Sequence, residues 1–154
     1  MITARKHSEA HGFVGDVVAV DTKPILDVLE KGYIPVISTL GVDDEGGIYN
    51  INADTAAAEI AGSLNAESMI SMTDIAGLMR DPKDPTTLMP VVDISEVPAL
   101  RREGVISGGM IPKVECCVEA IRQGVKKVFI IDGRVPHSII IEMLTDEGIG
   151  TMFV

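Results

Sequence analysis

Aromatic residues are scarce in this chain of 154 residues, which has no tryptophan, two tyrosines and three phenylalanines. A core must therefore be filled by Ile, Val, Ala, Met and Leu, and the hydrophobic content of 46% is sufficient for that. Together with 15 glycines, this mix favours an α/β domain over a β-sandwich or a coiled coil. The length is enough for one domain with its own core.

Cysteine is nearly absent, and the only two cysteines, Cys116 and Cys117, are neighbours. A disulfide between adjacent residues is strained, and the pair lacks the spacing of metal ligands. We therefore expect both on a helix, with one facing the core and the other at its edge. This usage predicts a reducing, cytoplasmic compartment.

Basic residues are outnumbered: 13 Lys and Arg face 23 Asp and Glu, for a net charge of −10 at pH 7. This balance disfavours nucleic acid and anionic membranes as partners, although a helix end can still bind a small anion locally. Long apolar runs are also missing, and residues 1–6 are not followed by an apolar stretch. We expect neither a membrane span nor a signal peptide.

Hydrophobic periodicity predicts strands that alternate with helices of 10–15 residues. This order is typical of a three-layer αβα sandwich with a mostly parallel sheet plus a β-hairpin. The predicted strands cover Ile2–Arg5, Phe13–Val20, Tyr33–Ser38, Glu67–Met72, Lys126–Ile131 and Thr151–Val154, and a hairpin tip covers Asp43–Gly47. The predicted helices run from Thr22 to Gly32, Asn52 to Leu64, Ser95 to Glu103, Gly109 to Gly124, and Pro136 or Ser138 to Leu144. Without a repeat or a low-complexity linker, one domain is predicted over residues 1–154.

Two short segments carry the strongest chemical signal: residues 50–54, Asn-Ile-Asn-Ala-Asp, and residues 108–113, Gly-Gly-Met-Ile-Pro-Lys. Each lies where a loop runs into a predicted helix, and helix N-termini bind anions, phosphates above all. Lys113 falls in a first turn, where the helix dipole disfavours positive charge. A bound polyphosphate would explain this placement, and with the carboxylate of Asp54 it indicates phosphoryl transfer. The alternative is a solvated lysine, at a dipole cost of about a few tenths of a kcal/mol.

Simpler structural roles compete for the first segment. Asp54 near a helix N-terminus is stabilised by the helix dipole, and Asn50 and Asn52 are common turn and cap residues. The sequence leaves both interpretations open.

The loop at residues 73–79 follows a predicted buried strand, at the sheet edge where ligands of α/β proteins bind. Thr73, Asp74 and Gly77 are therefore candidates to contact a nucleotide base or ribose. The alternative is an ordinary turn in which Thr or Asp acts as a cap. Walker A and G-x-G-x-x-G motifs are missing, and no histidine shows metal-ligand spacing.

Four segments in this order resemble the acetylglutamate kinases of the amino acid kinase superfamily, over essentially the whole chain. They are Gly-Tyr-Ile-Pro-Val-Ile-Ser at 32–38, Asn-Ile-Asn-Ala-Asp at 50–54, Thr-Asp-Ile-Ala-Gly-Leu at 73–78 and Gly-Gly-Met-Ile-Pro-Lys at 108–113. The resemblance implies transfer of the γ-phosphoryl group of ATP, with Mg²⁺, to the side-chain carboxylate of N-acetyl-L-glutamate in arginine biosynthesis. A carboxylate is already ionised at pH 7, so the reaction needs positioning and charge neutralisation rather than a general base.

The resemblance also implies residue roles. Lys113 and Asp54 are the catalytic residues: the lysine stabilises charge on the leaving phosphates, and the aspartate orients the catalytic lysines. Asn50, which holds the α-carboxylate, and Asn52 belong to the substrate site. The implied nucleotide site consists of Thr73, Asp74, Gly77, Leu78, Val105, Ile106, Ser107 and Gly109. The segment that binds inhibitory L-arginine in feedback-regulated members is similar to His137, Ser138, Glu142, Gly148 and Gly150.

Glu142 is the residue of that segment suited to pair with a guanidinium, and the alternative is an exposed helix glutamate.

The family's opening strand with its phosphate-binding lysine, its next glycine-rich loop and its substrate-binding arginine have no counterpart here. The resemblance therefore implies the C-terminal, ATP-binding portion of a protein about twice as long, without the N-terminal substrate-binding half and inactive alone. Full-length members are homo-oligomeric. Three alternatives stay open: a non-catalytic module that binds nucleotide or arginine, a fragment without function, and another amino acid kinase.

Overall fold

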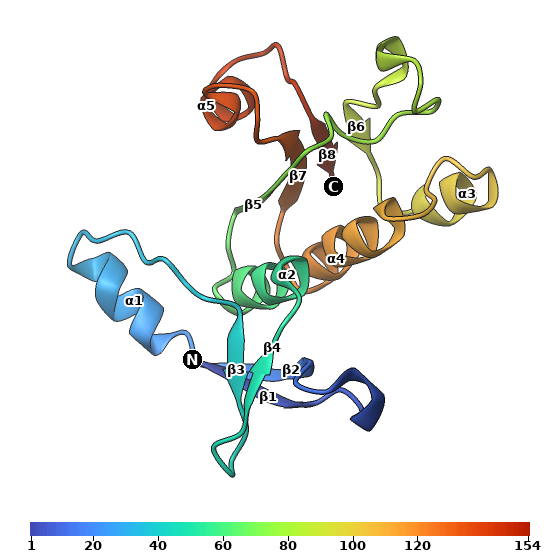
Figure 1. Cartoon of the computed structure of the whole chain (residues 1–154). Helices are drawn as coiled ribbons and strands as arrows, with labels where there is room; N and C mark the ends of the chain where they lie inside the picture. The colour runs from blue at the N-terminus through green and yellow to red at the C-terminus, as the bar shows by residue number, and fades with distance from the viewer. The chain divides into compact units, whose positions relative to one another are not determined.

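Two four-stranded sheets organise the chain (Figure 1). The computed structural model describes residues 1–154, and its contacts group them into two compact units, Met1–Leu64 and Asn65–Val154. Sequence analysis predicts one domain over the whole length. The two units are described separately below.

The sheet of the first unit has the strand order β2-β1-β3-β4. Its strands are β1 (Ile2–Lys6), β2 (Gly15–Val20), β3 (Leu40–Val42) and β4 (Ile48–Asn50). The strands predicted at Ile2–Arg5 and Phe13–Val20 are confirmed as β1 and β2, which pair antiparallel as a ribbon, and β3 pairs parallel to β1. A short 3-10 helix, η1 (Glu9–His11), lies within the ribbon's connection.

The predicted hairpin tip at Asp43–Gly47 is confirmed between the antiparallel strands β3 and β4. The carboxylate of Asp43 accepts hydrogen bonds from the backbone N–H of Gly47 at 2.7 Å and from the hydroxyl of Tyr49 at 2.7 Å. Because the Tyr49 hydrogen bond, and then that of Gly47, favour the ionised form, the pKa of Asp43 lies below its ordinary value. One side chain thus closes the turn.

The helices of the first unit follow the predicted signals. Helix α1 (Lys23–Glu30) carries Pro24 in its first turn, and helix α2 (Ala53–Ser63) begins directly after Asn52. A small core joins α2 to the sheet: its buried members are Ile2, Ala4, Ile51 and Ala56. The small side chains of Ala4 on β1 and Ala56 on α2 allow close packing in this core.

The strand predicted at Tyr33–Ser38 is wrong for this structure. The segment has no regular secondary structure, and the side chains of Ile34 and Val36 are 89% and 96% exposed. An apolar, β-branched sequence suits a strand, but a strand also needs a neighbour whose backbone pairs with it. No strand of the chain pairs with this segment.

The sheet of the second unit has the order β5-β7-β8-β6. Its strands are β5 (Ser68–Thr73), β6 (Val91–Val92), β7 (Lys127–Asp132) and β8 (Thr151–Phe153). The β5–β7 and β6–β8 pairs are parallel, whereas β7 and β8 are antiparallel. Two of the three strand pairs are parallel, which agrees with the mostly parallel sheet predicted from sequence. The antiparallel direction of β8 was not predicted, because a buried strand shows the same hydrophobic pattern in either direction. Strand β6 was not predicted, since two residues carry no periodicity.

Helices α3 (Val97–Arg102), α4 (Met110–Arg122) and α5 (Ser138–Leu144) complete the second unit, with a short 3-10 helix, η2 (Pro85–Thr87). Both α4 and α5 contact β7, whose residues 128–131 are all buried. As predicted, Cys117 faces the core while Cys116 is half-buried, and no disulfide joins them. None of the helices has the length and apolar character that a membrane span requires.

Gly150 provides a test of the packing between β7 and the turn before β8. A Cβ atom at Gly150 would overlap the carbonyl oxygen of Ile130 and lie 2.6 Å from Cγ2 of Ile131. Gly150→Ala should therefore lower the free energy of unfolding by about 1–3 kcal/mol, the usual cost of overpacking. Urea unfolding followed by far-UV circular dichroism measures this change.

Gly109 is the matched control, because a Cβ atom there meets nothing within 4 Å and φ is −66°. Gly109→Ala should leave stability unchanged or raise it by about 0.4–1 kcal/mol. Equal losses in the two variants would contradict the packing described for Gly150.

Candidate functional site

A cavity of about 360 Å³ lies at the carboxyl end of β5 in the second unit. Its volume is in the range of small-molecule sites. Most of its lining comes from three segments: the residues that follow β5, here called the β5 loop (residues 74–79), the turn at 105–109, and the first turn of α4. The lining residues are Thr73, Asp74, Ile75, Gly77, Leu78, Met79, Pro82, Val105, Ser107, Gly109, Met110 and Lys113.

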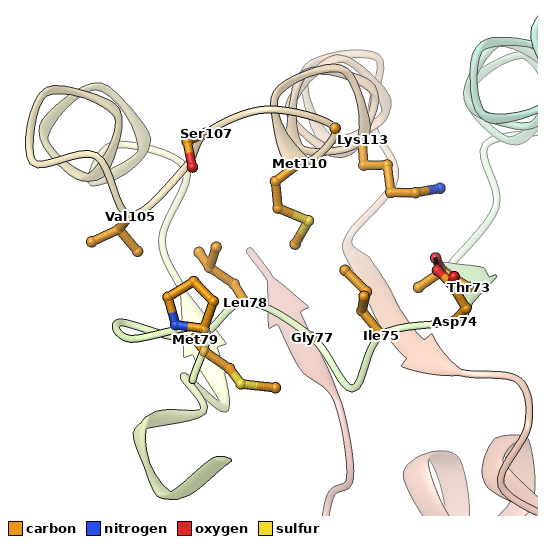
Figure 2. Close-up of a pocket in the computed structure, with 12 residues that line it drawn as sticks. Thr73, Asp74, Ile75, Gly77, Leu78, Met79, Val105, Ser107, Met110 and Lys113 are labelled. Atoms are coloured by element: carbon orange, nitrogen blue, oxygen red, sulfur yellow. Dashed lines mark hydrogen bonds between the residues drawn. The ribbon is translucent and has the colours of Figure 1, made fainter. Parts of the chain in front are cut away.

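The cavity has a polar end and an apolar end. Figure 2 shows the side chain of Lys113 extending from α4 toward the side on which Thr73 and Asp74 lie. Val105 and Leu78 lie away from this end, with Met110 between them and the lysine. The arrangement suits a ligand with an anionic part and a flat apolar part.

The turn before α4 ends in two glycines, so its backbone there is not covered by side chains. Gly108 adopts φ +53°, a conformation that glycine accepts without strain, and Gly109 directly precedes the helix. A Cβ atom built at either glycine would meet no other atom within 4 Å. A ligand can therefore approach the N-terminus of α4, a 13-residue helix whose dipole favours an anion.

The structure brings together all of the predicted nucleotide residues except Ile106. Ile106 is 3% exposed and does not line the cavity, and its predicted nucleotide contact stays a prediction. Its neighbours Val105 and Ser107 line the cavity. The lining residues that sequence analysis missed are Ile75, Met79, Pro82 and Met110, whose types carry no chemical signal.

An ion pair between Asp132 and Arg134 lies at the carboxyl end of β7. The carboxylate of Asp132 accepts hydrogen bonds from Nε and Nη2 of Arg134 at 2.9 and 2.8 Å, and from the Arg134 backbone N–H at 2.9 Å. The Arg134 side chain, and then its backbone N–H, hold the pKa of Asp132 below its ordinary value of 3.8. The pKa of Arg134 is raised, mainly by Asp132 and to a smaller extent by the charge of Asp74. Sequence analysis did not single out Arg134.

In the first unit, the capping interpretation of Asn52 is confirmed. Its side-chain oxygen accepts hydrogen bonds from the backbone N–H groups of Asp54 at 3.0 Å and Thr55 at 3.2 Å. That oxygen caps the N-terminus of α2, and the predicted substrate contact of Asn52 stays a prediction. Asp54 lies in the first turn of α2, and Asn50 is exposed at the end of β4.

The predicted arginine-binding segment is built around Glu142. Its Oε2 accepts hydrogen bonds from the backbone N–H groups of Ile149 at 2.7 Å and Gly150 at 3.0 Å. Glu142 is half-buried, so it is not an exposed helix residue: its carboxylate holds the turn that precedes β8. Its predicted pairing with a guanidinium stays a prediction. Ser138 is 2% exposed, and His137 adopts φ +62°.

A cavity of about 330 Å³ lies beside His137 and Ser138, with Arg134 and Met72 also in its wall. Glu142, Gly148 and Gly150 do not line it. The structure therefore separates the five residues of the predicted segment into two groups.

The family of the chain is shown by comparison with known proteins. The model of the amino acid kinase family matches residues 1–132, and the chain belongs to this family. It is similar to the acetylglutamate kinase of Thermosynechococcus vestitus, with 57% identity over 100% of this chain and 52% of the relative. The acetylglutamate kinase of Brachyspira hyodysenteriae is 55% identical, over 99% of this chain and 53% of the relative.

Solved structures agree with the fold. The structure of smu.665 from Streptococcus mutans UA159 superposes with a TM-score of 0.81 at 30% identity, over 99% of this chain and 56% of that one. The structure of N-acetylglutamate synthase from Neisseria gonorrhoeae, solved with coenzyme A and L-arginine, superposes with a TM-score of 0.88 at 28% identity. This match covers 99% of this chain and 36% of that one. The α/β, amino acid kinase-like class expected from sequence is confirmed.

The chain spans about half the length of the curated relatives it matches. This coverage supports the half-length expected from sequence. It does not support the finer expectation that the matched half is the C-terminal one.

The cap of α2 provides a stability test. Asn52→Ala removes the acceptor for two backbone N–H groups and should lower the free energy of unfolding by about 1 kcal/mol, within a usual range of about 0.5–2. Asn52→Asp keeps an acceptor and adds charge of the sign that a helix N-terminus favours, so it should retain stability. Urea unfolding compares the three proteins, and a loss in Asn52→Asp equal to that in Asn52→Ala would contradict the capping role.

The Asp132–Arg134 pair provides a pH test. Arg134→Ala should raise the pKa of Asp132 toward 3.8, because the favourable partner of the ionised form is lost. The stability that the pair supplies is present above pH 3.8 and is lost as the pH falls through the lowered pKa of the folded state. The measurement is an NMR titration of the Asp132 carboxyl carbon, with urea unfolding at neutral and acidic pH.

Asp93 is the internal reference, because its lowered pKa depends on Ser95 and should not change in Arg134→Ala. An unchanged Asp132 titration in the variant would show that Arg134 is not the cause.

Proposed function

We propose that this chain supplies the nucleotide site and part of the catalytic site of an acetylglutamate kinase. The reaction is transfer of the γ-phosphoryl group of ATP to the side-chain carboxylate of N-acetyl-L-glutamate. The observation that carries the proposal is the cavity at the carboxyl end of β5, with Lys113 at its polar end, in a chain 57% identical to an enzyme of that name. Family members of this name act in arginine biosynthesis, so the proposed setting is the cytoplasm.

The two ends of the cavity divide the roles. The adenine would lie against the apolar end near Val105 and Leu78, and the phosphates would point toward Lys113 and the glycine turn. A lysine at a helix N-terminus adds its charge to that of the dipole, which stabilises the charge that develops on the leaving phosphates. Asp74 would lie beside the ribose, where its carboxylate can accept hydroxyl hydrogen bonds.

The acceptor needs no general base, because a carboxylate is ionised at pH 7. What remains for the protein is to align two anions and to neutralise their charge. By family resemblance, Asn50 would bind the α-carboxylate of the substrate and Asp54 would orient the catalytic lysines.

Magnesium would enter with the nucleotide as part of the substrate. The chain contains no group of three or more His, Cys, Asp or Glu side chains that could hold a metal ion. These residues therefore do not fit a resident metal centre. Phosphate oxygens and water would coordinate the ion, the usual arrangement for Mg²⁺ at a nucleotide.

The activity belongs to a longer polypeptide in the relatives, which are about twice the length of this chain. We therefore expect the chain by itself to bind nucleotide with little turnover, and the whole enzyme to be a homo-oligomer. L-arginine as a feedback inhibitor is also part of the proposal. It is supported by the L-arginine complex of the similar N-acetylglutamate synthase and by the cavity beside His137.

Thermal unfolding with Mg-ADP tests the nucleotide site. Saturating nucleotide should raise the melting temperature, since a ligand at 100 times its Kd stabilises the folded state by about 2.7 kcal/mol. Lys113→Ala should weaken binding about tenfold or more, because a hydrogen bond to a charged group is worth about 1.5–3 kcal/mol. Asp74→Ala should also weaken it.

Lys126→Ala is the control of equal charge, because Lys126 is an exposed lysine outside the cavity. Its melting temperature should rise with Mg-ADP as in the wild type. Equal shifts in wild type and Lys113→Ala would contradict the assignment of the cavity.

Parallel titrations with L-arginine separate the rival functions. Stabilisation by arginine without any effect of Mg-ADP would favour an arginine-binding module. No effect of either ligand would contradict both binding functions. In the full-length enzyme, transfer to aspartate or glutamate instead of N-acetyl-L-glutamate would indicate another amino acid kinase.

A further inference from the structure

Thr151 joins β8 to the β5 loop through one buried hydrogen bond. Thr151 is fully buried, and its Oγ1 accepts a hydrogen bond of 2.8 Å from the backbone N–H of Leu78, 73 residues away in the sequence. Leu78 is itself 1% exposed and lines the cavity. Thr151 does not line it, so it can act on a ligand only through the loop.

The loop backbone packs directly on this hydroxyl. Gly77 adopts φ +152°, and a Cβ atom there would lie 2.5 Å from Oγ1 and 3.1 Å from the backbone nitrogen of Thr151. The absence of a side chain at Gly77 is what lets the loop approach β8. The path of the loop past the cavity is therefore set by Thr151.

Other contacts hold the loop on its far side and leave the Leu78 N–H to Thr151. The carbonyl of Leu78 accepts a hydrogen bond from the Met89 N–H at 2.8 Å, and Met79 pairs with Leu88 in an isolated bridge. These contacts use the carbonyl side of Leu78. A buried N–H without an acceptor is costly, so loss of the hydroxyl should make the loop rearrange.

Thr151 is fixed in turn by the residues before it. The Glu142 carboxylate accepts hydrogen bonds from the backbone N–H groups of Ile149 and Gly150, and Gly150 packs against the backbone of Ile130. Thr151 then pairs with Ile130 across the antiparallel β7–β8 ladder. Helix α5, the turn and the first residue of β8 thus form one connected support beneath the loop.

We propose that Thr151 is a positioning residue for the nucleotide: its hydroxyl holds Leu78, and with it the cavity wall formed by the β5 loop. Glu142 supports the same wall indirectly, because it fixes the turn that leads into Thr151. The proposal rests on the nucleotide site proposed above for its ligand. It adds a residue from the opposite end of the second unit's sequence to the determinants of nucleotide affinity.

Thr151→Val and Thr151→Ser test the hydroxyl separately from the shape of the side chain. Valine keeps the branched shape without the acceptor, and serine keeps the acceptor. In Thr151→Val, amide hydrogen exchange at Leu78 should be about tenfold or more faster, and the Kd of Mg-ADP should be about tenfold weaker, as expected for the loss of one buried hydrogen bond. Thr151→Ser should resemble the wild type in both measurements.

Val128→Ala controls for general destabilisation of the sheet. Val128 is fully buried on β7, near the end of the strand remote from Thr73 and the cavity. This variant should melt at a lower temperature while leaving the Mg-ADP Kd unchanged. A merely structural role of Thr151 would instead make the Kd follow stability in both variants, which would overturn the proposal.

Glu142→Ala and Glu142→Gln keep the test available if Thr151→Val does not fold. Alanine removes the acceptor of the two turn amides and should speed exchange at Leu78, whereas glutamine retains an acceptor oxygen and should not. Unchanged Leu78 exchange in both Thr151→Val and Glu142→Ala would overturn the proposal, and so would faster exchange with an unchanged Kd. Faster Leu78 exchange in a protein whose wild type binds no Mg-ADP would support the link and refute the nucleotide function.

Discussion

The parallel pairing of β5 with β7 is the constraint on which the second unit depends. Six residue pairs, from Ser68 with Lys127 to Thr73 with Asp132, align the two strands so that both end at the same edge. Each strand must then leave the sheet there, which places the β5 loop and the Asp132–Arg134 turn side by side. Residues 128–131 are buried throughout, so β7 cannot shift by one residue without exposing apolar surface. The cavity is a consequence of this register.

The cavity also shows how an acidic protein can offer a site to an anion. The chain carries a net charge of −10, yet the N-terminus of α4 gathers a lysine, a glycine turn and a helix dipole on one wall. Charges beyond about 10 Å are screened at ordinary ionic strength, so the local arrangement decides the affinity. Asp74, on the other wall, keeps the polar end from being uniformly positive. That balance suits a ligand that carries both phosphate and sugar hydroxyls.

Prediction from sequence succeeded where a residue acts through its own neighbours. Asn52 caps α2 because its side chain reaches amides two and three residues ahead, and Asp43 closes its hairpin in the same local way. It failed where a distant segment supplies the partner. Tyr33–Ser38 has the composition of a strand but no strand of the chain pairs with it. The two backbone amides that Glu142 holds lie across a turn, and the pattern of its own helix does not reveal them.

The sequence by itself determined the family, the helix starts and the loops that meet at the cavity, since these depend on composition, caps and short motifs. Only the tertiary structure decided that β8 runs antiparallel to β7, that Arg134 pairs with Asp132, and that the Thr151 hydroxyl meets Leu78. The physical reason is range. A cap or turn is settled within four residues, whereas a contact across 73 residues depends on the packing of every element between them.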